Sequence, residues 1–306
     1  MEITATMVKN LREATGAGMM DCKKALLEAA GDVDRAVDVL RTKGLADLAK
    51  KAGRATNEGL VTAYVEPSGR IAALVEVNCE TDFVARNAEF TTFANALVEQ
   101  VAVDAPEGLT GGAAALLSQA WKRNPSLTVE QALGEQVTKL GENMGVARFT
   151  RYEIAEGAGA IGCYVHGVGR IGVLVEVAGA TIDRPEIATL VRDLAMHTAA
   201  AAPMYATRDE VPAEIIEHEK SIYLAQAAET GKPEAIQAKI AEGRLEKYYK
   251  EVCLLEQPFV KDPDTSVSRL VAEVSKAVGA PLSVIRFTRW ALGETYDGPA
   301  PETCGC

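Results

Sequence analysis

The sequence predicts an α+β fold, with a small three-helix head followed by a body of two duplicated units. Each unit is expected to be a three-stranded antiparallel sheet with helices, and the second is interrupted by a helical hairpin. Apolar residues at helical spacing run through the first 54 residues. A two-strand pattern at 59–77 returns at 159–177, and a strand-like segment at 148–152 returns at 286–290.

The head, residues 1–54, is predicted to contain three short helices. Residues that start or break helices separate the apolar stripes: Thr4, Gly16, Gly18, Asp21 and Asp32. Each helix is too short to be stable alone in water, so the three must pack on one another. The segment Gly44–Arg54 is expected to be a solvated connector to the body.

The duplication predicts the two sheets. At an offset of 100 residues, these eight residues recur with the same identity: Tyr64, Gly69, Arg70, Ile71, Leu74, Val75, Glu76 and Val77. Each copy has two strand-like runs around a glycine-containing turn, which is typical of a β-hairpin. The segment Arg148–Tyr152 and its echo Arg286–Trp290 supply a third strand with one buried face. Helical stretches, Phe90–Val101 and Glu186–Ala199, lie between hairpin and final strand.

The second copy is longer because two helical runs, Val211–Glu229 and Pro233–Glu251, are inserted in it. Such a projecting hairpin is either a dimerisation arm or a packed lid. The predicted boundaries are 1–54 for the head and linker, 55–156 for the first unit, 157–202 with 252–293 for the second unit, 203–251 for the inserted hairpin and 294–306 for a flexible tail.

The net charge of −11 lies mainly in the body, because the first 54 residues are slightly basic. An acidic body is a poor footprint for nucleic acid, whose phosphates are bound by Lys and Arg. We therefore expect a protein partner and no direct nucleic-acid contact. No apolar run approaches the roughly 18–20 residues that span a bilayer. The start Met1–Thr4 lacks the pattern of a signal peptide, so we expect a cytoplasmic protein without a membrane partner.

The two copies differ after their shared hairpin. A plain turn follows Val177, whereas Val77 is followed by a longer segment that contains Thr81, Asp82, Phe83 and Val84. In one interpretation, Thr81 or Asp82 caps the next helix while Phe83 folds back onto the core. In the other, Phe83 is an exposed aromatic anchor for a partner, since aromatic residues dominate binding hot spots.

Similar alternatives arise at Met19 and Met20, which cannot both face a small three-helix core. One or both fill the core, or they form an adaptable contact patch with Arg12 nearby. His166 stands in a turn where the first copy has Glu66-Pro67, and a lone turn histidine is usually only solvated. His197 lies in a helical run and is expected to be a packing residue.

Motifs for catalysis are missing from the sequence. It has no phosphate-binding GxxxxGK[ST] loop, no GxSxG turn and no cluster of acids and nucleophiles. None of the three histidines stands at metal-ligand spacing to a cysteine or carboxylate. We expect no catalytic residues, no metal and no cofactor. The tail cysteines, Cys304 and Cys306, belong to a frayed end or else capture a metal or oxidise.

Five segments carry a family resemblance. Residues 8–26 contain VKNLREATGAGMMDCKKAL and residues 76–86 contain EVNCETDFVAR, which are long enough to be specific. Shorter matches follow in the expected order at 195–197, 242–244 and 257–260. Together they resemble bacterial elongation factor Ts over nearly the whole chain.

The resemblance implies a nucleotide exchange factor that does no covalent chemistry and binds elongation factor Tu in its GDP-bound and nucleotide-free states. The head would resemble ubiquitin-associated domains. Its residues Arg12, Met19 and Met20 match positions that dock on the GTPase domain of the partner. The loop of Thr81, Asp82, Phe83 and Val84 matches the element that disturbs the partner's magnesium site. His166 matches a contact with another partner domain.

The inserted hairpin, 203–251, corresponds to a region that aids homodimerisation in some members of that family. Some members also extend past the last strand into a helical module that grips the partner. The segment Gly293–Pro301 has no such helical pattern, so the head and loop are expected to carry more of the binding. The alternative from another class is a passive protein-binding scaffold, and an enzyme of unknown chemistry is a more distant third.

Overall fold

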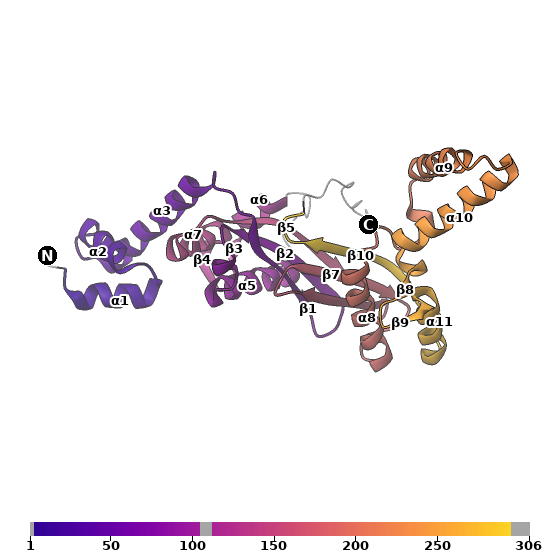
Figure 1. The fold of residues 1–306 in the computed structure, drawn as a ribbon. Coiled ribbons are helices and arrows are strands. Elements are labelled where there is room, and N and C mark those ends of the chain that lie inside the picture. The colour runs from indigo at the N-terminus through magenta and orange to yellow at the C-terminus, as the bar shows by residue number, and fades with distance from the viewer. Residues whose placement is uncertain (1–2, 105–111, 295–306) are drawn as a thin grey trace.

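The computed structural model describes residues 3–104 and 112–294. The chain mixes helices with antiparallel sheets, as the sequence predicts. Figure 1 shows the head at one end, the sheets in the middle and a helical hairpin projecting at the other end. Within the described part of the chain, no helix is long and apolar enough to cross a membrane. Cys304 and Cys306 lie outside the described residues.

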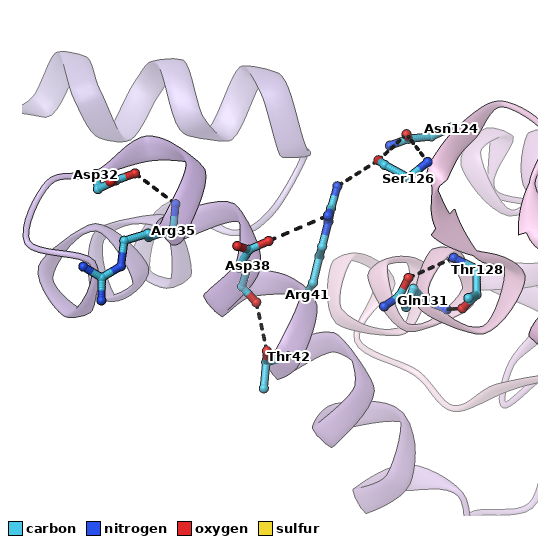
Figure 2. A network of polar contacts seen from close by, with 9 residues as sticks. All are labelled: Asp32, Arg35, Asp38, Arg41, Thr42, Asn124, Ser126, Thr128 and Gln131. Carbon is cyan, nitrogen blue, oxygen red and sulfur yellow. Dashed lines mark hydrogen bonds and ion pairs between the residues drawn. The ribbon is translucent and has the colours of Figure 1, made fainter.

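The head contains three helices: α1 (Ala5–Thr15), α2 (Met19–Glu28) and α3 (Val33–Lys51). The Thr4 hydroxyl caps α1 by accepting the Met7 N–H at 3.3 Å, and Asp32 caps α3 by accepting the Arg35 N–H at 3.0 Å (Figure 2). Buried side chains of the helices and of the turns between them form one small core: Val8, Leu11, Ala17, Cys22, Ala25, Leu26, Ala29, Ala36 and Leu40.

The expectation of a solvated connector over Gly44–Arg54 is wrong, because helix α3 continues to Lys51. Its C-terminal half packs on α7 (Val129–Leu140) of the body, with Gly44 buried at the crossing. A Cβ on Gly44 would lie only 3.1 Å from the carbonyl carbon of Gly134. Because neither residue has a side chain there, the two backbones approach closely, and α3 joins the head firmly to the body.

Polar contacts surround this crossing. Figure 2 shows Arg41 reaching from α3 to the body, where its Nη2 donates to Ser126 Oγ at 3.2 Å. Lys51 Nζ donates to the Val137 carbonyl at 3.2 Å. These two hydrogen bonds attach α3 to the body, one near the middle of the helix and one at its C-terminal end.

Two three-stranded sheets form the body. The first has the order β1-β2-β5, with β1 (Glu58–Val65), β2 (Ile71–Cys79) and β5 (Met144–Glu153). The second has the order β10-β7-β6, with β6 (Gly159–His166), β7 (Ile171–Ala178) and β10 (Ser283–Ala291). All pairings are antiparallel, and the third strand of each sheet carries a register shift at the same relative place.

One face of each sheet packs against the other sheet. The apolar residues of this interface are Val61, Ala72, Leu74, Tyr152, Ile154, Ile161, Leu174 and Trp290. Two equivalent backbone hydrogen bonds cross it: Val61 N–H donates to the Gly169 carbonyl and Ile161 N–H to the Gly69 carbonyl, both at 2.8 Å. The duplicated units thus contact one another through equivalent residues.

Equivalent arginines reinforce that interface. Arg148 pairs with Glu76 of its own sheet at 2.7 Å and lies over the Trp290 ring of the other unit. Arg286 likewise pairs with Glu176 at 2.7 Å and lies over the Tyr152 ring. Glu76 is almost fully buried, and its other carboxylate oxygen accepts the Gly293 N–H at 3.0 Å. Losing Arg148 would leave this buried carboxylate without a cation, which is strongly destabilising.

Helices cover the outer faces. The first sheet is covered by α4 (Asp82–Ala85), α5 (Ala88–Asp104), α6 (Gly112–Ser118) and α7. The second is covered by α8 (Pro185–Ala201) and α11 (Val267–Val278). Each unit also has a short two-stranded ribbon that the sequence analysis did not predict: β3 (Ala120–Trp121) with β4 (Asn124–Thr128), and β8 (Pro258–Phe259) with β9 (Asp262–Ser266).

The inserted hairpin consists of α9 (Ala213–Ala228) and α10 (Glu234–Val252). Two short 3-10 helices stand at its base, η2 (Arg208–Glu210) and η3 (Leu254–Glu256). Arg208 binds both carboxylate oxygens of Glu246, at 2.8 and 2.7 Å, and also pairs with Glu256. The hairpin projects away from the sheets (Figure 1), so it is not a lid over them.

His197 of α8 is fully buried and fixed at both ring nitrogens. Nδ1 accepts the Val260 N–H at 3.1 Å, so Nε2 carries the proton that is donated to Gln257 Oε1 at 2.9 Å. This confirms the expected packing role. Burial lowers the pKa of His197 below its ordinary value.

We expect this burial to make stability depend on pH. A histidine whose pKa is lowered by folding contributes stability that is complete above its unfolded pKa of about 6.5 and is lost as the pH falls through its folded pKa. The melting temperature of the chain should therefore fall from pH 7.5 to 5.5, and less steeply in His197→Gln. His218→Gln, at an exposed histidine of α9, is the control. An equal slope in all three proteins contradicts this assignment.

Candidate partner-binding site

The loop that distinguishes the first unit begins with Thr81. Its hydroxyl accepts the Val84 N–H at 3.4 Å and so caps the single-turn helix α4. Val84 and Ala85 are buried and anchor this turn to the core of the first unit. Capping by Thr81 is therefore confirmed.

Phe83, on the other side of the same turn, is 84% exposed. The expectation that it folds back onto the core is wrong, since α4 turns Val84 inward and Phe83 outward. Asp82 beside it is half-exposed and pairs with Arg86 one turn later at 3.2 Å. The loop thus presents a solvated aromatic ring with a carboxylate next to it.

The second unit has no counterpart of α4. After β7 the chain passes through Gly179, whose φ of 106° suits glycine and whose added Cβ would collide with the Pro281 carbonyl. The turn then runs directly into α8. The exposed aromatic loop therefore belongs to the first unit and is not a requirement of the shared fold.

On the head, Met19 and Met20 begin helix α2 and are 59% and 64% exposed. Gly16, with φ of 69°, ends α1 and directs the chain into α2, while Cys22 and Leu26 fill the core beneath. The alternative that a methionine fills the core is wrong. Arg12, in the last turn of α1, is exposed as well.

Lys139 of α7 lies between the head and the first unit. A Cβ on Gly16 would be 2.8 Å from Lys139 Nζ, so this ammonium group contacts the turn that precedes Met19. The same Lys139 forms an ion pair with Glu89 at the start of α5. The Lys139 side chain thus links the Gly16 turn, which precedes Met19, to the start of α5, the helix that follows the Phe83 loop.

His166 ends β6 in the second unit and is exposed. Its Nδ1 lies 3.1 Å from the Tyr164 hydroxyl. The adjoining turn also exposes Val168, at 78%, with a φ of 54° that is strained for a β-branched residue. His166 therefore lies beside an exposed turn of the second unit that carries the apolar side chain of Val168.

Sequence reasoning missed Glu142, which lies between α7 and β5. Its carboxylate accepts both the N–H of Thr81, at 3.0 Å, and the Thr81 hydroxyl, at 2.6 Å. A signal was present in the duplication, because the second copy has Ala280 at the equivalent place before Arg286. Among the described residues, no group of three or more His, Cys, Asp or Glu is placed to hold a metal ion.

Comparison with known proteins agrees with these features. The sequence model of the family described as Elongation factor TS matches residues 80–294. Elongation factor Ts of Syntrophotalea carbinolica is 48% identical over 298 residues, 96% of this chain and 94% of that protein. That of Clostridium perfringens is 48% identical over 295 residues, 95% and 93% of the two chains.

The relative from Trichlorobacter lovleyi, also named Elongation factor Ts, is 45% identical over 300 residues, 96% of this chain and 94% of that protein. The family model starts at residue 80, whereas these relatives also cover most of the head. The chain therefore belongs to the elongation factor Ts family, the translation factors that promote nucleotide exchange on elongation factor Tu.

Proposed function

We propose that this chain releases GDP from elongation factor Tu in the cytoplasm by two separable contacts. The head docks on the GTPase domain through Arg12, Met19 and Met20. The loop of Thr81, Asp82, Phe83 and Val84 then enters beside the magnesium site of the partner. The observation that carries the proposal is the 84% exposure of Phe83 on a turn whose other side is anchored in the core.

Exchange needs no covalent chemistry from this chain. A GTPase that holds GDP with nanomolar affinity is stabilised by about 12 kcal/mol. A factor lowers that affinity only by binding the nucleotide-free form better than the GDP-bound form, and the coupling is reciprocal. A coupling of about 4 kcal/mol corresponds to roughly a thousandfold change in affinity. An aromatic ring wedged between elements that hold magnesium would act only against the GDP-bound form.

The head contact and the loop contact are proposed to control different quantities, the affinity for the partner and the rate of GDP release. Flexible, exposed methionines suit a docking surface that adapts to its partner, so Arg12, Met19 and Met20 set affinity. The loop sets the rate of release. His166 and the second unit rest on another domain of the partner. The body is acidic, which supports a protein partner without direct nucleic-acid contact.

The hairpin of 203–251 is proposed to support homodimerisation. It projects from the body (Figure 1) and exposes Leu224 and Ile236. Side chains of this kind on a projecting helical pair suit a second copy of the same hairpin. We do not assign the hairpin a part in GDP release.

GDP release measured by fluorescence tests the proposal against the passive scaffold. Elongation factor Tu loaded with a fluorescent GDP analogue is mixed with excess unlabelled GDP and increasing amounts of this chain. Acceleration that saturates with factor concentration supports exchange. Complex formation without acceleration supports the scaffold and contradicts exchange.

A further inference from the structure

The loop is held by a cluster of five residues from three segments, here named the loop clamp: Arg54, Glu80, Thr81, Glu142 and Asn143. Its central contact joins Glu142 to Thr81. Each carboxylate oxygen of Glu142 accepts one hydrogen bond, from the Thr81 N–H at 3.0 Å and from the Thr81 hydroxyl at 2.6 Å. A carboxylate that accepts two donors from one residue fixes both the position and the rotamer of that residue.

The second half of the clamp ties the same loop to the end of the head linker. Glu80 Oε1 accepts the Asn143 N–H at 2.6 Å and a proton of Arg54 Nη1 at 3.2 Å. The Asn143 amide donates to the Arg54 carbonyl at 2.8 Å. These hydrogen bonds lower the pKa of Glu80, chiefly through the Asn143 N–H, so the carboxylate stays charged at neutral pH.

The hydrogen bond of the hydroxyl decides what else Thr81 can do. Since the Thr81 proton is donated to Glu142, a lone pair of the hydroxyl is free to accept the Val84 N–H and cap α4. A helix of four residues cannot be stable by itself. The clamp therefore holds the start of the turn that carries Phe83, and it adds to the anchoring of the other side of the turn by buried Val84 and Ala85. The phenyl ring, which is 84% exposed, supplies no such anchor.

The second unit is an internal comparison. Its equivalents of Glu80, Glu142 and Asn143 are Ala180, Ala280 and Pro281. The helices before the two turns end alike, at left-handed Gly141 and Gly279. In the second unit, however, the turn is closed by Ser275, whose hydroxyl donates to the Ala280 carbonyl at 2.7 Å and accepts the Leu282 N–H at 3.3 Å. The fold thus closes this turn without a carboxylate where no aromatic loop is present.

We propose that Glu142 is a positioning residue that preorganises the Phe83 loop for insertion into the partner. This inference rests on the proposed exchange function of that loop. Glu142 acts through Thr81 and does not itself touch the partner nucleotide. Ordering the loop before contact removes the conformational entropy that insertion would otherwise cost, so Glu142 raises the rate of release at saturation and has little effect on docking by the head.

The first test is hydrogen exchange of the free full-length chain. In wild type, the Thr81 and Val84 amides are expected to be protected, and Glu142→Ala should speed their exchange about tenfold or more. Glu142→Gln should preserve most of the protection, because its carbonyl accepts the Thr81 N–H while its NH₂ donates to the Thr81 hydroxyl. Equal exchange of these amides in wild type and Glu142→Ala overturns the clamp, whatever the partner does.

The second test is GDP release from elongation factor Tu. Glu142→Ala should lower the maximal rate about tenfold and leave the half-saturating concentration within about twofold, and Glu142→Gln should restore most of the rate. A higher half-saturating concentration with an unchanged maximal rate overturns the positioning role. Equal loss in both variants does so too, since charge and not geometry would then matter.

Phe83→Ala separates failure of this inference from failure of the proposed function. If Phe83→Ala lowers the maximal rate of GDP release while Glu142→Ala keeps the wild-type rate, only the role of Glu142 is overturned. If Phe83→Ala releases GDP as fast as wild type, the function proposed for the loop is overturned, and the positioning role of Glu142 is overturned with it. Ser275→Ala, at the equivalent turn of the second unit, should leave the maximal rate unchanged, which separates loop positioning from a general loosening of the body.

Discussion

Replacing Phe83 by alanine is expected to cause the largest loss of exchange activity of any single substitution in the loop. The maximal rate of GDP release at saturating factor should fall about tenfold or more, the cost of losing one aromatic hot-spot residue. The half-saturating concentration should change little, because the head is unaltered. Stopped-flow fluorescence of GDP release at several factor concentrations separates these two quantities.

The variant should fold normally, since Phe83 is 84% exposed and makes little contribution to the core. Ile236→Ala is a matched control, because Ile236 is also an exposed apolar residue but lies on the hairpin helix α10. Wild-type release by Ile236→Ala and slow release by Phe83→Ala assign the effect to the loop. Unchanged release by Phe83→Ala rules out the wedge.

Removing both head methionines is expected to weaken docking instead. The Met19→Ala/Met20→Ala variant should raise the half-saturating concentration roughly thirtyfold, which corresponds to about 2 kcal/mol of lost contact free energy. Its maximal rate, reached at higher factor concentration, should stay near that of wild type. Titration calorimetry with nucleotide-free elongation factor Tu measures the affinity directly.

Leu27→Ala is the control for that variant, because Leu27 lies on the same helix α2 and is 58% exposed. It should bind as wild type does if the docking surface is confined to the start of α2. Unaltered affinity in the double methionine variant contradicts the docking role. Equal weakening by Leu27→Ala would mean that the contact surface extends along α2.

The sheets were predictable because the duplication repeats a strand pattern together with its turn. Arg148 and Arg286 recur because each pairs with a glutamate of its own sheet and covers an aromatic ring of the other. The helix starts at Thr4 and Asp32 were predictable too, since capping depends on a few neighbouring residues. Such features are either local in sequence or present in two copies.

Features that depend on distant contacts were not predictable. Nothing near Gly44 in the sequence indicates that Gly134 lies against it and lets α3 continue past the expected connector. The exposure of Phe83 depends on which side of α4 meets the core, and Thr81 caps the turn in either case. Glu142 lies 61 residues after Thr81 in the sequence, so their contact could be found only in the structure.

The role of the partner's magnesium site is tested most directly by measuring GDP release with magnesium present and with magnesium chelated. If Phe83 acts by disturbing the magnesium site, wild type should exceed Phe83→Ala about tenfold with magnesium and by no more than about twofold without it. Chelation removes the magnesium ion whose contacts the ring would otherwise disturb, so the ring then has little left to contribute. A ratio that stays about tenfold after chelation contradicts the account, because Phe83 would then act on the nucleotide by another route.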